Sequence, residues 1–157
     1  MRRRIAITGV ILVGLLVAAV PFGLRAYREH EARAVIARYD VLLAEALETL
    51  QPELVSEVAD LDEVGRIGSY STHLWGNNIR LQSELLDLEV LDLRSEEPTL
   101  TVTVRERWRY LERDRESGVA LGDEVEETQT LAYTLVRREG ELIVYRSSTV
   151  EPEGEVR

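Results

Sequence analysis

Cysteine and lysine are absent from this chain of 157 residues, and histidine occurs only twice. The absence of cysteine excludes disulfide scaffolds and cysteine-ligated metal sites. All 19 basic residues are arginine, a bias typical of bacterial coding sequences rich in G and C. Phosphate-binding loops, dinucleotide fingerprints and the Gly-x-Ser-x-Gly nucleophile motif are also missing. These absences exclude the common nucleotide-binding, dehydrogenase and hydrolase functions.

Negative charge dominates the chain and is unevenly distributed. The formal net charge is −10, yet residues 1–38 hold seven arginines against two acids, whereas the remainder holds 12 arginines against 27 acids. Because so acidic a segment repels phosphate backbones, we expect no nucleic-acid binding. The length indicates one small domain and is too short for a doubly wound fold or an α/β barrel.

An uncharged run, Ile5–Leu24, follows three consecutive arginines near the N-terminus. Its 20 residues would span roughly 30 Å as a helix, the thickness of the hydrocarbon core. It could be a cleaved signal peptide, cut before Val20, or an uncleaved anchor. The anchor is favoured because the run exceeds the ~7–15 residues of a signal core and Pro21 would follow the cut.

Arginines set the expected orientation of this segment. Three precede it, whereas those that follow it are partly offset by Glu29 and Glu31. We therefore expect a single-pass protein of the cell membrane, with residues 1–4 as a cytoplasmic stub and residues 25–150 as an extracytoplasmic domain. Gly14 and Ala18 form a small-xxx-small pair that favours helix pairing, and hence a homo-oligomer. Residues 151–157 are expected to be a disordered tail.

Three helices are predicted after this segment. Apolar residues recur every three or four positions from Val35 to Leu50, the pattern of a long amphipathic helix. A second helix begins at Pro52 and ends at Gly65, since proline suits a first helical position and glycine an end. A third helix is expected over residues 66–77.

A two-residue period then predicts four antiparallel strands. They cover Leu85–Leu93, Leu100–Tyr110, Val125–Leu135 and Leu142–Val150, and Glu139-Gly140 supplies a tight turn before the last. The expected fold is α+β, with three helices packed against a curved four-stranded sheet.

Pairing Arg109 with Glu126 across the second hairpin places arginines and threonines on one face of the sheet. The opposite face is then aliphatic at one end and aromatic and polar at the other, as at a cavity mouth. Alternatively, this end overhangs the helices and is simply solvated. The candidate cavity-lining residues are Glu106, Trp108, Tyr110, Glu127, Gln129 and Tyr133.

Two segments carry a resemblance to a known family, "VRERWRY" (Val104–Tyr110) and "YTLVRREGELIVYR" (Tyr133–Arg146). With the helix and strand order, they resemble the nuclear transport factor 2-like cone fold, and within it the IMS-like domain of chloroplast division proteins and membrane-anchored bacterial relatives. The resemblance covers roughly Glu29–Val150. It implies a non-enzymatic domain that binds partner proteins in an envelope or intermembrane compartment, and it supplies no catalytic residue.

Related cone folds include isomerases and dehydratases that use an acid or histidine in the cavity, which makes five residues worth weighing: Tyr39, Asp60, Asp62, His73 and Glu106. Of these only Glu106 stands on an inward row. Asp60, Asp62 and Glu63 could hold a hard cation, but they lack a glycine-punctuated loop, so a solvated helix end is expected. We expect no catalytic residue, no metal and no cofactor.

The sequence therefore favours a membrane-anchored, non-enzymatic, extracytoplasmic protein-interaction module with an envelope protein as its partner. The alternative is a small-molecule-binding or isomerase/dehydratase-type cavity protein that uses Glu106 and the aromatic mouth. A third hypothesis is a plain spacer on a membrane anchor.

Overall fold

The computed structural model describes the backbone of residues 4–150 and the side chains of residues 24–150. The chain divides into two compact units, residues 1–31 and 32–157. Within the described residues, no helix is both long and apolar enough to cross a bilayer. The predicted cytoplasmic stub, nearly all of the predicted span over residues 5–24 and the predicted tail over residues 151–157 lie outside the residues described with side chains.

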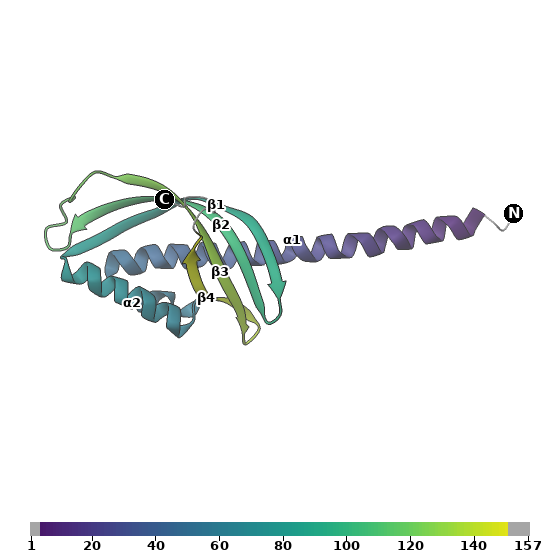
Figure 1. The fold of residues 1–157 in the computed structure, drawn as a ribbon, viewed down its shortest axis with the longest axis horizontal. Coiled ribbons are helices and arrows are strands. Elements are labelled where there is room, and N and C mark those ends of the chain that lie inside the picture. Colours follow the sequence, from purple (N-terminus) through teal and green to yellow (C-terminus); the bar gives the residue numbers. More distant parts are fainter. Residues whose placement is uncertain (1–3, 151–157) are drawn as a thin grey trace, which may run out of the picture. The chain divides into compact units, whose positions relative to one another are not determined.

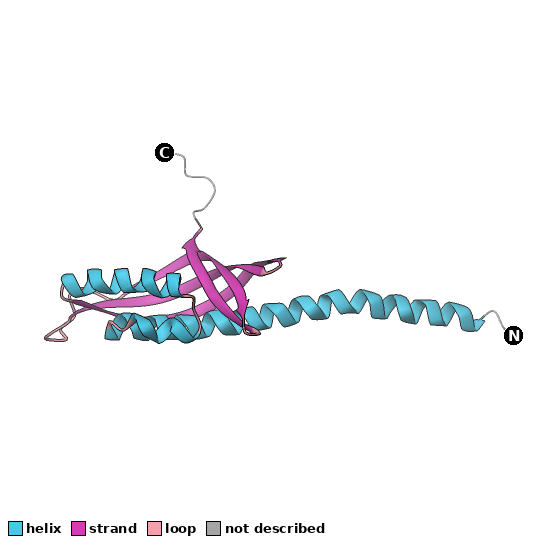
Figure 2. Ribbon diagram, turned by 90° about the horizontal axis from the view of Figure 1, so that it is seen from below, coloured by secondary structure: helices cyan, strands magenta, loops and turns pink. Residues whose placement is uncertain are grey.

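The element order confirms the α+β class and the four-stranded antiparallel sheet (Figures 1 and 2). Neighbours in sequence are neighbours in the sheet, in the order β1-β2-β3-β4. In the second unit, the sheet curves over the end of α1 and over α2 (Figure 1). The elements are α1 (Arg4–Thr49), a 3₁₀ helix η1 (Pro52–Glu57), α2 (Leu61–Gly76), β1 (Ile79–Glu96), β2 (Thr99–Asp114), β3 (Val125–Arg138) and β4 (Glu141–Thr149).

A helical stripe of α1 forms one wall of the core. Ala32, Ile36 and Tyr39 are fully buried at steps of four and three residues, and Ala46 and Leu47 continue the stripe. Apolar side chains of α2 and of all four strands complete the same cluster. The long amphipathic helix predicted from Val35 to Leu50 is thus confirmed.

The prediction of a second helix over residues 52–65 was wrong, whereas the third helix, predicted over residues 66–77, is confirmed as the later part of α2. Residues 52–57 form a 3₁₀ helix, because the chain then pairs with β4: Val144 N–H donates to Val58 O and Asp60 N–H to Val144 O, both at 2.8 Å. A single helix, α2, begins after Asp60 and runs through Gly65, where the sequence predicted an end. Burial of Ile67 and Leu74 outweighs the cost of about 1 kcal/mol for one helical glycine.

The predicted register between β2 and β3 is confirmed, with Arg109 opposite Glu126 and Glu106 opposite Gln129. The turn Glu139-Gly140 is also confirmed, and both residues have the positive φ, 56° and 93°, that such two-residue turns require. The first strand is longer than predicted. It begins at Ile79 and contains two β-bulges, which break the strict alternation that sequence reading depends on.

Candidate functional site

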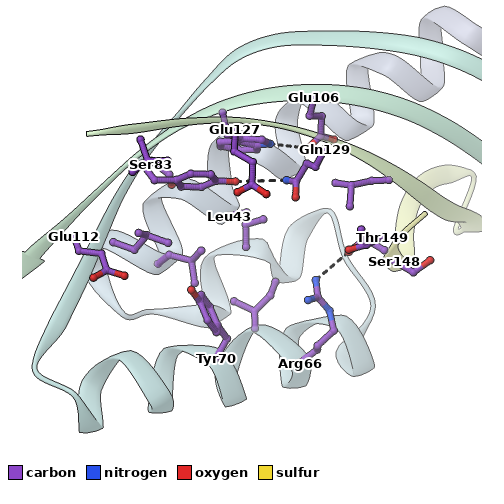
Figure 3. Close-up of a pocket in the computed structure, with 18 of the residues that line it drawn as sticks. Leu43, Arg66, Tyr70, Ser83, Glu106, Glu112, Glu127, Gln129, Ser148 and Thr149 are labelled. Atoms are coloured by element: carbon purple, nitrogen blue, oxygen red, sulfur yellow. Dashed lines mark hydrogen bonds between the residues drawn. The ribbon is translucent and has the colours of Figure 1, made fainter. Parts of the chain in front are cut away.

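A cavity of about 700 Å³ lies within the second unit, between the inner face of the sheet and the two helices (Figure 3). This volume falls in the range of roughly 300–1,000 Å³ that small-molecule sites occupy. Aliphatic side chains line it from both the helices and the sheet: Leu43, Leu47, Ile67, Leu81 and Leu131. Polar and aromatic side chains line the rest of the wall.

All six predicted cavity residues line this space: Glu106, Trp108, Tyr110, Glu127, Gln129 and Tyr133. The alternation of β2 and β3 places them there, because inward positions recur every second residue. The rings of Trp108 and Tyr110 are stacked, with their centroids 6.0 Å apart and their planes 13° from parallel. Gln129 Nε2 donates to the hydroxyl of Tyr110 at 3.5 Å.

Beside Trp108, Tyr133 joins two fully buried acids. Its hydroxyl oxygen lies 3.1 Å from Asp40 Oδ1 and 2.9 Å from Glu106 Oε1. The indole of Trp108 donates to Glu106 Oε2 at 2.7 Å, whereas Asp40 Oδ2 has no partner among the described residues. The α1 acid and the β2 acid therefore meet through one hydroxyl group.

The number of protons available for hydrogen bonding determines which of the two carboxyl groups, Asp40 or Glu106, is charged. The hydroxyl of Tyr133 can donate to only one of the two carboxyl groups, so the other must carry a proton and donate to Tyr133. Burial and the neighbouring Glu106 raise the pKa of Asp40 well above its usual range. Burial also raises the pKa of Glu106, but Trp108 and Tyr133 donate to it and favour its charge. Asp40 is therefore the protonated member and Glu106 carries the negative charge.

A second buried network lies around Glu63 of α2. Arg66 donates to both of its carboxylate oxygens, at 2.9 and 2.6 Å, and Tyr39 and Ser147 donate to Oε1 at 2.5 and 2.8 Å. Burial alone would raise the pKa of Glu63, but these four donated hydrogen bonds and the charge of Arg66 outweigh it and lower the pKa. Glu63 is therefore charged and paired, and the expectation that it is solvated was wrong.

The two networks meet at an aromatic pair, since Tyr39 and Tyr133 pack edge to face with centroids 5.9 Å apart. Asp40 and Arg66 were not among the predicted site residues, although the helical spacing carried a signal for the two buried acids, Asp40 and Glu63. Asp40 is four residues after Ile36 and Glu63 is four residues before Ile67, so both acids share a helix face with buried residues.

The remaining candidates lie apart from this cavity. Asp60 is the N-cap of α2 and accepts a hydrogen bond from the backbone of Asp62 at 3.2 Å. His73 lies in the last turn of α2, where Asn77 packs against it, and it does not line the cavity. Within the part of the chain described with side chains, no group of acids or histidines is arranged to hold a metal ion.

No family model matches the sequence. No curated protein matches it either. Solved structures do resemble the fold. The intermembrane space region of the chloroplast protein ARC6 superposes with a TM-score of 0.66 at 13% identity, over 77% of this chain and 95% of that one. An NTF2-like superfamily protein from Salmonella enterica serovar Typhimurium gives 0.51 at 10% identity, over 84% and 97%.

These likenesses establish the fold. The chain has the nuclear transport factor 2-like cone fold, as its strand motifs indicated, and shares it with the intermembrane space region of ARC6. Identities this low carry neither activity nor partners from one protein to another.

Proposed function

We propose that this domain binds a small organic molecule in the cavity beneath its sheet. The observation that carries the proposal is the combination of a ligand-sized, partly aliphatic space with a few fixed polar groups, the composition typical of binding sites. Glu106 is held by Trp108 and Tyr133 and so is oriented before any ligand arrives. Both of its oxygens already accept hydrogen bonds, which suits recognition better than proton transfer.

Binding in the cavity can be tested by filling it. In Ser83→Trp, an indole would extend from β1 into the space, whereas Thr128→Trp adds the same group on the outer face of β3. We expect saturation-transfer NMR of the full chain in nonionic detergent, with a library of water-soluble fragments, to give hits that Thr128→Trp retains and Ser83→Trp loses. Identical hit sets for the two folded variants would contradict cavity binding.

A second function is supported by the uncharged run at residues 5–24 and by exposed apolar side chains of the domain. In this proposal the domain is a non-enzymatic interaction module outside the cytoplasm, anchored in the cell membrane by residues 5–24, and an envelope protein is its partner. Exposed apolar side chains near the β2–β3 loop, Val119, Leu121 and Val125, would offer part of the contact surface.

Cross-linking in cells tests this second function. The full chain should capture one envelope protein in near-stoichiometric amount, and replacement of Val119 and Leu121 by serine should abolish the capture. A matched double change on α1 and α2, Val41→Ser with Leu61→Ser, removes other exposed apolar groups and should leave it intact. Equal capture by both variants, or none by the natural chain, would exclude this surface.

A further inference from the structure

Strand alternation separates the charges of the sheet. On β2, Arg105, Arg107 and Arg109 point outward and pair with acids of the neighbouring strands. The inward rows of β2 and β3 carry Glu106, Glu112 and Glu127, and all three line the cavity. The outer face of the sheet therefore carries paired arginines, whereas the cavity side carries the buried Glu106 and the solvent-exposed Glu112 and Glu127.

The cavity acids lack basic partners. Glu112 and Glu127 make no side-chain hydrogen bond or ion pair with any described residue, and Asp123 of the β2–β3 loop adds a fourth carboxylate to the wall. Figure 3 shows Glu127 extending from the sheet into the space above Leu43. Among the described lining residues Arg66 is the one basic group, and Glu63 neutralises it through two hydrogen bonds. The net charge of the wall is negative.

Aromatic rings stand beside these acids. Trp108 and Tyr110 form a stacked pair on the sheet, and Tyr70 faces the same space from α2 (Figure 3). Burial and the charges of Glu127 and Glu106 raise the pKa of Tyr110 to about 12, as expected in a negative potential. Aromatic faces attract cations through their quadrupole, and carboxylates add to that attraction.

From this arrangement we infer that the cavity is selective for an organic cation with an apolar body, an amine or a quaternary ammonium compound. The inference rests on the proposed small-molecule function and specifies its ligand class. The apolar body packs on the aliphatic side chains of the cavity, and the cationic group lies beside Glu127 and the rings of Trp108 and Tyr110. An anion of the same shape meets several carboxylates and one arginine that is already paired.

Three probes with one apolar body test the inference: phenylpropyl-trimethylammonium, phenylpropanol and phenylpropanoate. We titrate each into the full chain in nonionic detergent and measure affinity by calorimetry. We expect the cation to bind at least about tenfold more tightly than the alcohol, and the anion to bind most weakly. Glu127→Gln should lower the affinity for the cation by about three- to tenfold and leave the affinity for the alcohol unchanged.

Glu89→Gln is the matched control, because Glu89 lies on the outer face of β1 in an exposed pair with Arg105. It removes the same charge and should change the affinity for the cation less than about twofold. Equal binding of cation and alcohol, or equal losses in the two glutamine variants, overturns the inference and leaves small-molecule binding standing. Failure of all three probes to bind, together with identical fragment hits in the two tryptophan variants, overturns both.

Discussion

Replacement of Arg66 by methionine is expected to destabilise the domain by about 2–3 kcal/mol at neutral pH. Glu63 is nearly fully buried, and without Arg66 its charge keeps only the hydrogen bonds from Tyr39 and Ser147. Removal of one partner from a buried pair costs about 3–5 kcal/mol, and the half-exposed Arg66 side chain reduces that figure. Urea unfolding of the full chain, followed by tryptophan fluorescence, measures the difference.

The pH dependence identifies the cause. Since the folded-state pKa of Glu63 lies below its ordinary value of 4.5, its contribution to stability is present above that value and is lost as pH falls through the folded pKa. The gap between the natural chain and Arg66→Met should therefore close in acid. Arg38→Met removes an arginine from an exposed pair with Glu57 and should cost less than about 0.5 kcal/mol. Equal losses in the two variants would show that the Glu63 pair contributes nothing beyond a surface ion pair.

Asp40→Asn is expected to stabilise the domain above neutral pH. An amide keeps the shape of the protonated carboxyl group and can donate to Tyr133 in its place. Asparagine does not titrate, so the variant avoids the cost of protonating a buried carboxyl group when the chain folds above neutral pH. The expected result is an unfolding temperature above that of the natural chain at about pH 8.

The contribution of Asp40 to stability decreases as pH rises, because folding requires this carboxyl group to bind a proton. Because the folded-state pKa of Asp40 is raised, the unfolded chain releases that proton first, near 3.8. The contribution of Asp40 to stability is complete below that value and falls by up to about 1.4 kcal/mol per pH unit until the folded pKa is passed. The free energy of unfolding of Asp40→Asn should therefore increase relative to that of the natural chain over this pH range, and the two should not differ in this way in acid. Asp62→Asn makes the same change on an exposed residue of α2 and serves as control. A gain of equal size there, or a pH-independent gain, would contradict the assignment.

Sequence periodicity predicted the sheet well because each residue of a half-buried strand must face either the core or the solvent. The inward and outward rows of β2 and β3 fixed the pairing of Arg109 with Glu126, and with it the six residues that now line the cavity. A shift of one residue would have buried the arginines. Helical periodicity gave the wrong prediction where pairing with a distant strand determined the structure. Residues 58–60 pair with β4 instead of continuing the predicted helix.

Buried acids were harder to predict, because a carboxylate on a helix is most often solvated. Asp40 and Glu63 lie on buried helix faces. Arg66 is only three residues from Glu63, but the partners that complete the two networks, Tyr133 and Ser147, lie 93 and 84 residues away. Local patterns carry no information at that separation. Glu106 was identified because the strand period alone assigns it to the inner face.

The two bulges of β1 hinder edge-to-edge pairing between copies of the protein at high local concentration. β1 is an edge strand of 18 residues, and a long, regular edge invites a strand from another copy to continue the sheet. Bulges at Leu85/Asp87 and Val90/Asp92 interrupt the row of free backbone donors and acceptors, so an incoming strand would lose register within a few residues. Copies crowded together on one surface would therefore resist fusing into a continuous sheet.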